Sequence, residues 1–444
     1  MNRQIDCFIP WSDDSQCVLT KQALISDNNV ANVLQLTESV GATKTIKYSA
    51  ETASAPYVLL YTKYDTLQLG FHALDRMLTV AKDYDALMLY ADHYVELPSG
   101  KRLPMPLIDY QVGSVRDDFQ MGSLLLLKTE VLKRYISQPN LHRYQYAALY
   151  DLRLFLSREK LPVHIQEFLY TEVETDTRLS GQKQFDYVDP RNRARQVELE
   201  RACTRHLRAI NAYLHAGEFD TIKFEDSDKF NVEATVVIPV RDRVRTIADA
   251  IESVLKQKTA FTFNLMVVDN GSTDGTSNVI EKYTADPRVI HIQPQRNDLG
   301  IGGCWNMAVH DDRVGRFVVQ LDSDDLYSGE DTLQRIVDMF FQENAAMVIG
   351  SYRMCDFQLE TLPPGLIDHR EWTSQNGRNN ALRINGLGAP RAFYTPVLRE
   401  LQIPNTSYGE DYALGLMISR RYRIGRIYDE LYLCRRWEGN SDAA

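Results

Sequence analysis

An acidic run follows an apolar stretch in the second half of this chain of 444 residues. Residues 317–321 read as a buried strand, and the run at 322–325 is Asp-Ser-Asp-Asp. On an extended segment, side chains two residues apart point the same way, so Asp322 and Asp324 can share one cation. Carboxylate oxygens suit Mg²⁺ or Mn²⁺, and such ions keep positions open for phosphate oxygens. We predict a metal-bound diphosphate site, and the alternative is a solvated turn that caps the next helix.

Two further polar clusters could take part in chemistry. Asp269 and Asn270 directly follow an apolar strand, although Asn-Gly is also an ordinary turn signal. Glu410 and Asp411 precede a helical stretch at 412–421, where exposed N–H groups favour a carboxylate for purely structural reasons. From position alone, a catalytic base and a helix cap both remain open for this pair.

The elements that must position these clusters alternate along the chain. Apolar strand runs occur at 234–238, 264–268, 289–292, 317–321 and 346–350, with helical patterns between most of them. This alternation predicts a largely parallel sheet covered by helices. Ligands of such sheets bind at the carboxyl ends of the strands, where the acidic run would lie.

The ordered motifs of this half resemble those of the family 2 glycosyltransferases. They are IPVRDR, VVDNGSTDGT, NDLGIGGCWNMA, QLDSDD and YGEDYALGLMISRRYRIG, spread over roughly residues 234–437. The resemblance implies a GT-A fold, which is a Rossmann-like α/β sheet that binds a nucleotide-diphospho-sugar. It also implies an inverting transfer of the sugar to a hydroxyl group, with Mg²⁺ or Mn²⁺ as cofactor.

The resemblance also assigns roles to individual residues. Asp411, beside Glu410, would take the proton of the acceptor hydroxyl, and Asp322 and Asp324 would hold the metal. The residues expected to bind the nucleotide sugar are Pro239, Val240, Arg241, Asp242, Asp269, Asn270, Asn297, Gly300, Asn306, Asp322, Ser323, Arg435 and Arg436. The two arginines suit phosphate through their forked donors, and a surface basic pair is the alternative.

A polar loop between the acidic run and the predicted base would receive the sugar and the acceptor. Trp372, Asn385 and Gly386 are the residues expected there. Trp372 is either a stacking platform or a packed aromatic. Two positions depart from the family pattern, because Asn270 stands where aspartate is usual and Trp437 where histidine is frequent.

The first half of the chain repeats features of the second. Residues 57–65 parallel 317–325, residues 85–90 parallel 345–350, and residues 122–132 parallel 388–398. The first copy has Thr62 at the place of Asp322, Tyr64 at that of Asp324, and Ala148-Leu149 at that of Glu410-Asp411. We therefore expect two related domains in tandem, of which the first is degenerate and non-catalytic. The expected bounds are 1–186 for this domain, 187–231 for a helical linker and 232–444 for the catalytic domain.

The length, net charge, cysteine spacing and apolar runs of the chain limit the classes of protein to which it can belong. The chain is too long for one ordinary core, and its net charge of −10 argues against a nucleic-acid partner. Its six cysteines form no CxxC pair, so we expect neither a disulfide framework nor a zinc site. No apolar run approaches the roughly 20 residues of a membrane span. We expect a cytoplasmic protein whose contact with the inner face of a membrane would be peripheral.

These observations favour a metal-dependent glycosyltransferase that acts in surface polysaccharide or glycan synthesis. Its partners would be a nucleotide-diphospho-sugar donor and a carbohydrate or lipid-linked glycan acceptor. A sugar-1-phosphate nucleotidyltransferase is an alternative, disfavoured because residues 239–245 contain no glycine. A non-catalytic nucleotide- or glycan-binding scaffold is the other alternative, disfavoured because the second copy keeps both sets of carboxylates.

Overall fold

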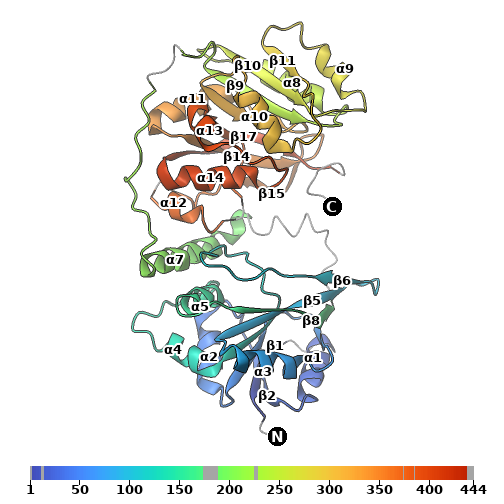
Figure 1. The fold of residues 1–444 in the computed structure, drawn as a ribbon, viewed down its shortest axis with the longest axis vertical. Helices are drawn as coiled ribbons and strands as arrows, with labels where there is room; N and C mark the ends of the chain where they lie inside the picture. Colours follow the sequence, from blue (N-terminus) through green and yellow to red (C-terminus); the bar gives the residue numbers. More distant parts are fainter. Residues whose placement is uncertain are drawn as a thin grey trace. The chain divides into compact units, whose positions relative to one another are not determined.

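The computed structural model describes residues 3–11, 15–173, 189–224, 229–373, 375–384 and 386–437. The chain divides into two compact units (Figure 1), one of residues 1–179 and 194–213 and the other of residues 180–193 and 214–444. Nearly all of the helix α7 (Arg193–Ala209) therefore belongs to the first unit. Arg205 of this helix donates to Asp151 at 2.6 Å, and Glu198 accepts the N–H of Tyr146 at 2.7 Å.

The first unit is a mixed sheet with helices. Its sheet has the order β2-β1-β3-β7-β5-β8-β4, with β6 paired to β5. Its elements before α7 are β1 (Ile5–Pro10), α1 (Ser15–Ile25), β2 (Val30–Leu36), α2 (Thr43–Thr52), β3 (Tyr57–Tyr61), β4 (Thr66–Leu69), α3 (Ala73–Asp83), β5 (Met88–Glu96), β6 (Arg102–Met105), β7 (Leu124–Lys128), α4 (Thr129–Ile136), α5 (Ala148–Ser157) and β8 (Val163–Val173).

The second unit is also a mixed α/β structure. Its sheet has the order β11-β10-β9-β12-β16-β14-β17-β13, with β15 paired to β14. Its elements follow η1 (Pro190–Asn192) and are β9 (Ala234–Val240), α8 (Ile247–Leu255), β10 (Phe263–Asp269), α9 (Thr276–Glu281), β11 (Val289–Ile292), α10 (Ile301–Val309), β12 (Phe317–Gln320), β13 (Leu326–Tyr327), α11 (Thr332–Glu343), β14 (Met347–Cys355), β15 (Thr361–Ile367), α12 (Gly377–Asn380), β16 (Arg391–Tyr394), α13 (Thr395–Leu401), α14 (Glu410–Arg421) and β17 (Ile424–Arg435).

The two sheets share one strand order. β2, β1, β3, β7, β5, β8 and β4 of the first correspond in turn to β10, β9, β12, β16, β14, β17 and β13 of the second, and β6 corresponds to β15. The central pairings also have the same directions: β1 is parallel to β3 as β9 is to β12, and β7 is antiparallel to β3 as β16 is to β12. The second sheet has one extra strand, β11, at its edge. The repeat predicted from the sequence is therefore present in the fold.

Strand register refines the predicted alignment of the two copies. Met88 pairs with Leu127, and Met347 pairs with Phe393, so Met88 corresponds to Met347. The sequence alignment of 85–90 with 345–350 was therefore wrong by one residue, because an apolar strand offers no marker that fixes its register. The pairing of β4 with β8 also differs by two residues from that of β13 with β17, so between Thr62 and β4 the two copies do not correspond residue by residue.

The expectation of a largely parallel sheet is correct for only part of the second unit. β11, β10, β9 and β12 are parallel neighbours, but β16 enters antiparallel between β12 and β14. This short strand follows the long polar segment after β15, whose sequence has no strand periodicity to announce it. The core of the unit surrounds β12, where Phe317 stacks on Phe340 with ring centroids 4.3 Å apart.

No helix in the described ranges combines the length and the apolar character that crossing a membrane requires.

Candidate active site

The acidic run turns the chain from β12 into β13. The N–H of Asp325 donates to the carbonyl of Asp322 at 3.2 Å, which closes the turn. Asp325 is buried, and its carboxylate accepts the N–H of Arg435 in β17 at 2.7 Å. Burial raises the pKa of Asp325 well above its ordinary value, and the charges of Asp322 and Asp324 add to this. Asp325 therefore holds β17 to the turn and is not open to a ligand.

Asp322 is the exposed member of the run. Gln320 donates to its Oδ1 at 2.9 Å, and the N–H of Asp322 donates to the hydroxyl of Tyr432 at 3.1 Å. Although the side chain reaches solvent, the surrounding protein partly desolvates it and raises its pKa, while Arg391 lowers it. A carboxylate in this state gains from a cation nearby.

Asp324 lies at the same turn and is buried. The indole Nε1 of Trp437 donates to its Oδ2 at 3.0 Å, and the Nε of Arg243 lies 4.0 Å from the same oxygen. Trp437, which stands where histidine is frequent in the family, is therefore a neighbour of one predicted metal carboxylate. Within the described ranges, no three His, Cys, Asp or Glu side chains are grouped for a metal. Asp322 and Asp324 offer oxygen ligands of the kind that Mg²⁺ prefers, and a cation held there would take its remaining ligands from a bound diphosphate and water.

Arg391 links the acidic run to the predicted base. It begins β16, beside β12, and its Nη1 lies 3.0 Å from Oδ2 of Asp411. Its main-chain N–H donates to Oε1 of Gln320 at 3.2 Å. Burial by itself would lower the pKa of Arg391, but Asp411 and Asp322 raise it. The guanidinium therefore stays charged, in contact with Asp411 and influenced by the charge of Asp322, which lies about 90 residues away in the chain.

Glu410 and Asp411 form the first turn of α14. Gly409 before them has φ of 79°, a conformation that glycine adopts without strain. Oδ1 of Asp411 accepts the N–H of Tyr412 at 2.7 Å, so this oxygen binds a main-chain donor of the first helical turn, as the capping alternative expects. The other oxygen, Oδ2, faces Arg391. Oε2 of Glu410 is buried and has no hydrogen-bond partner among the described residues. Burial raises the pKa of Glu410, and Asp411 raises it further.

The loops predicted to bind the base and ribose are tied to one another. Oδ1 of Asp242, which follows Pro239, Val240 and Arg241, accepts the N–H of Thr273 at 2.7 Å. Burial would raise the pKa of Asp269, but hydrogen bonds from Ser272 and Ser277 lower it, so this carboxylate orders the turn after β10. Asn270 donates to the carbonyl of Leu299 at 2.9 Å, which fixes the distance between two of the loops.

The neighbouring loop before α10 is also held by its own contacts. Asn297 is exposed. The N–H of Gly300 donates to Asn405 at 2.8 Å, and a Cβ on this glycine would lie 2.5 Å from the main chain of Thr406. Asn306 donates to the carbonyl of Ile403 at 2.7 Å and accepts its N–H at 3.2 Å. Both amide atoms of Asn306 are thus engaged in holding α10 to the 403–406 segment.

The side chain of Arg435, at the end of β17, is buried and not part of a surface basic pair. Arg435 is 2% exposed, and its Nη1 donates to Asp249 on α8 at 2.7 Å. It therefore links α8 to the acidic turn, because its Nε also donates to the carbonyl of Asp324. The main-chain N–H of Arg436 donates to the carbonyl of Cys355 at 2.8 Å. The sequence could not reveal this, because Asp249 lies 186 residues away.

Two of the three residues proposed for the sugar side are described. Trp372 is 1% exposed, and the guanidinium of Arg426 lies 4.5 Å from its ring, so Trp372 is the packed aromatic and not a stacking platform. Gly386 is partly exposed, with φ of 112°. Asn385 lies outside the described residues. Sequence reasoning also missed Arg391, and the only signal was indirect: its counterpart in the first copy is Leu125.

The comparisons with known proteins agree with the predicted class. Residues 235–395 match the model of glycosyl transferase family 2. An uncharacterized glycosyltransferase of Rickettsia felis is 27% identical over 203 residues, which are 45% of this chain and 32% of that protein. TuaG of Bacillus subtilis, a putative teichuronic acid biosynthesis glycosyltransferase, is 28% identical over 120 residues, which are 27% of this chain and 46% of that protein.

A solved structure is also similar to part of the chain. Residues 1–349 of TarS from S. aureus, in complex with UDP-GlcNAc, share 22% identity and a TM-score of 0.40, covering 48% of this chain and 61% of that one. The match to the family model confirms the family predicted from the ordered motifs, and the second unit carries a family 2 glycosyltransferase domain. The chain spans about a third of the length of the Rickettsia relative.

Proposed function

We propose that the second unit transfers a sugar from a nucleotide-diphospho-sugar to a hydroxyl group of a glycan, with inversion at the anomeric carbon. The observation that carries this proposal is the position of Arg391. Its guanidinium lies 3.0 Å from Asp411, at the start of α14, and its charge lowers the pKa of the open carboxylate of Asp322, at the end of β12. A transferase needs both a site for the departing diphosphate and a base for the acceptor, and here the two adjoin.

Asp322 and Asp324 would hold a divalent cation such as Mg²⁺ or Mn²⁺. Bound there, the cation would neutralise the charge that grows on the departing diphosphate. Ser323 and the loops that carry Asp242, Asn270 and Gly300 would position the nucleotide. These loops are cross-linked by hydrogen bonds, so little ordering is left for the moment of binding.

Asp411 would act on the acceptor. Its Oδ1 is engaged by the helix N–H of Tyr412, and Arg391 holds Oδ2, so the carboxylate has a fixed orientation. A carboxylate held in this way can take the proton of a hydroxyl as its oxygen attacks the anomeric carbon. The name of the B. subtilis relative supports a polysaccharide acceptor.

The test uses the purified full chain with Mg²⁺ or Mn²⁺ and a panel of UDP-, GDP- and dTDP-sugars. We expect release of the nucleoside diphosphate from at least one donor, and we expect no release in EDTA. The Asp411→Asn variant should still bind that donor while its turnover is lost. An inert wild-type chain across the whole panel, beside an equally inert variant, would instead support a binding scaffold.

A further inference from the structure

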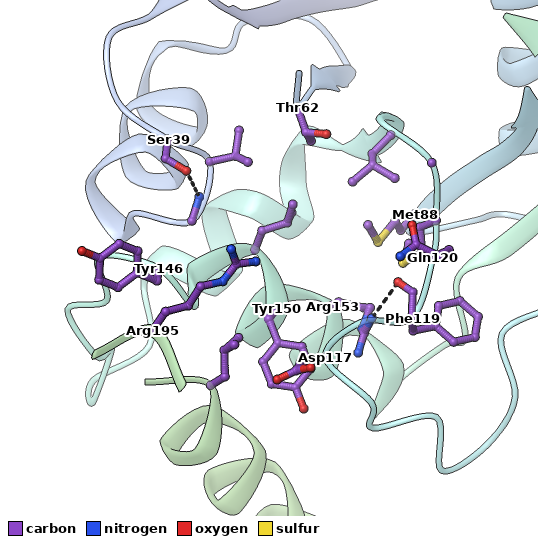
Figure 2. A pocket seen from close by; sticks show the side chains of 17 residues that line it. Ser39, Thr62, Met88, Asp117, Phe119, Gln120, Tyr146, Tyr150, Arg153 and Arg195 are labelled. Carbon is purple, nitrogen blue, oxygen red and sulfur yellow. Dashed lines mark hydrogen bonds between the residues drawn. The ribbon is translucent and has the colours of Figure 1, made fainter. Parts of the chain in front are cut away.

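The first unit has a pocket of about 280 Å³ at the position of the second unit's candidate active site (Figure 2). Thr62 lies there in place of Asp322, as the register of β1 with β3 and of β9 with β12 shows. Leu125 stands in place of Arg391, and Leu149 in place of Asp411, since α5 and α14 begin at corresponding residues. All three line the pocket. The first unit therefore has a pocket at this position although it lacks the carboxylates of the second unit.

The charges that line this pocket are mainly positive. Its 17 lining residues include two arginines, Arg153 and Arg195, and one carboxylate, Asp117. Arg153 is 5% exposed; it donates to the carbonyls of Arg116 and Phe119, and it lies over the ring of Tyr150 at 4.9 Å. Its Nε is buried and has no hydrogen-bond partner within the described part of the chain. A buried guanidinium with a spare donor favours an anion beside it.

Arg195 comes to the pocket from a different element. It belongs to α7 and is exposed, and in the view of Figure 2 it lies between Tyr146 and Tyr150, with Arg153 beyond Tyr150. An exposed guanidinium is free to close on a ligand that enters from solvent. Two guanidiniums on separate elements can hold the same carboxylate or phosphate group from two sides.

The rest of the lining suits a sugar. Ser39, Thr62 and Gln120 offer hydroxyl and amide groups, and Tyr146 offers an aromatic face. The volume of the pocket, about 280 Å³, lies just below the roughly 300–1,000 Å³ of small-molecule sites, which suits one ring and not a whole nucleotide sugar. Among the described residues the first sheet also has no counterpart of β11, so this side of the described sheet is shorter than in the second unit.

We infer that this pocket binds a saccharide unit that carries a carboxylate or a phosphate, and that it does so without a metal. At the candidate site of the second unit the arginines Arg391 and Arg243 already face carboxylates, so an anionic ligand there would be helped by a cation bound with it. The first unit has apolar side chains in place of Arg391 and Asp411, and it supplies positive charge from Arg153 and Arg195. This inference concerns the first unit alone and does not require that the second unit transfers sugars.

The test is calorimetric titration of the full chain in EDTA. Every protein that is titrated also carries Asp322→Ala, which removes a predicted metal ligand of the second unit. The probes are D-glucuronate, glucose 1-phosphate and neutral D-glucose. We expect at least one anion to bind at least about tenfold more tightly than glucose, a difference that corresponds to roughly one charge-assisted contact. Binding of glucuronate alone or of glucose 1-phosphate alone would identify a carboxylate or a phosphate as the recognised group.

Two variants of the lining locate the binding site. Arg195→Ala removes the exposed guanidinium, and Leu149→Trp fills the pocket; each should weaken binding of the anion at least about tenfold. Arg201→Ala is the matched control, because Arg201 is an exposed arginine of the same helix that does not line the pocket, and it should change nothing. Binding that neither lining variant alters, equal binding of glucose, or no binding of either anion at millimolar concentration would overturn the inference.

Discussion

The end of β3 in the first unit and the end of β12 in the second are the same place in the same fold, with opposite chemistry. Thr62 follows β3, whereas Asp322 follows β12 with an open carboxylate. Leu125 and Leu149 likewise replace Arg391 and Asp411. Since the first unit forms its sheet without these charges, they are not needed for the fold. The difference separates the residues that build the sheet from those that remain available for a ligand.

The largest expected effect comes from making the second unit like the first at this place. Asp322→Thr, and separately Asp324→Ala, should lower kcat/KM for transfer by at least about a thousandfold, because the charge of the departing diphosphate would lose its cation. The melting temperature of Asp322→Thr should stay close to that of the wild type, since Thr62 is accommodated at the same strand end. Metal-dependent turnover and thermal unfolding measure both effects. A variant that kept its activity would break the comparison.

Asp411→Asn should have the next largest effect. Loss of a general base costs about a hundredfold to ten-thousandfold in kcat. Binding of the donor should change little, because Asp411 is assigned to the acceptor. Calorimetry of nucleotide-sugar binding beside steady-state kinetics tests this division, and a variant that lost donor binding would place Asp411 elsewhere in the reaction. Leu149→Asn at the corresponding position of the first unit is the control and should leave kcat unchanged.

Arg391→Leu copies the residue of the first unit and should lower kcat by about tenfold to a hundredfold, because the base would lose its oriented partner. It should also alter the dependence of activity on pH. Arg391 lowers the pKa of Asp322, so its removal raises that pKa. Metal binding needs the ionised carboxylate, and the acid limb of the activity profile should therefore move to higher pH. A pH–rate profile that keeps its acid limb would contradict this role.

A stability effect should be confined to the first unit. Burial, together with Arg158 and Arg153, lowers the pKa of His206 from 6.5 to about 4. The unfolded chain therefore binds more protons than the folded one between these values, and stability must fall as the pH decreases from about 6.5 towards 4. We expect a loss of roughly 2–3 kcal/mol over this window. His206→Gln should reduce the loss, as measured by urea unfolding of the full chain at several pH values.

The smallest expected effect is a difference in stability between variants of Asp325 and variants of Asp322, two neighbouring acids of the second unit. Asp325→Ala removes the acceptor of the N–H of Arg435 and should cost about 1–2 kcal/mol of stability. Asp325→Asn keeps an acceptor oxygen and should cost less. Asp322→Ala should cost little, because its carboxylate is exposed. Thermal unfolding of the three variants ranks them, and an equal loss for all three would show that the run acts as one structural turn.

Much of the fold followed from the sequence because its signals are local. Residues 317–321 are an apolar run long enough to identify β12, and the repeated motifs identified the tandem organisation. The acidic run could be predicted as a site because it directly follows that strand. Whether its carboxylates hold a metal remains a prediction.

The rest of the site depends on contacts between distant segments. Arg391 faces Asp411 across a polar loop whose sequence has no periodicity, and Arg435 is committed to Asp249 on a helix far back in the chain. Trp372 looked available because its neighbours are polar, yet its ring is covered by Arg426. In each case the role of the side chain depends on the residue that tertiary packing places beside it, and the residue type alone does not reveal that neighbour.

In the part of the chain that the structure describes, the first sheet has no counterpart of β11, and β2 therefore lies at its margin. Among the described residues, this margin is a seven-residue strand, VANVLQL, with neither proline nor charge. The main-chain groups on its outer side face no strand of the described ranges, and such a margin is a ready template for pairing with another polypeptide. In the second unit the marginal strand β11 has only four residues. Self-association during refolding should therefore begin at β2, and a lysine in place of Asn32 or Leu34 would be the simplest way to suppress it.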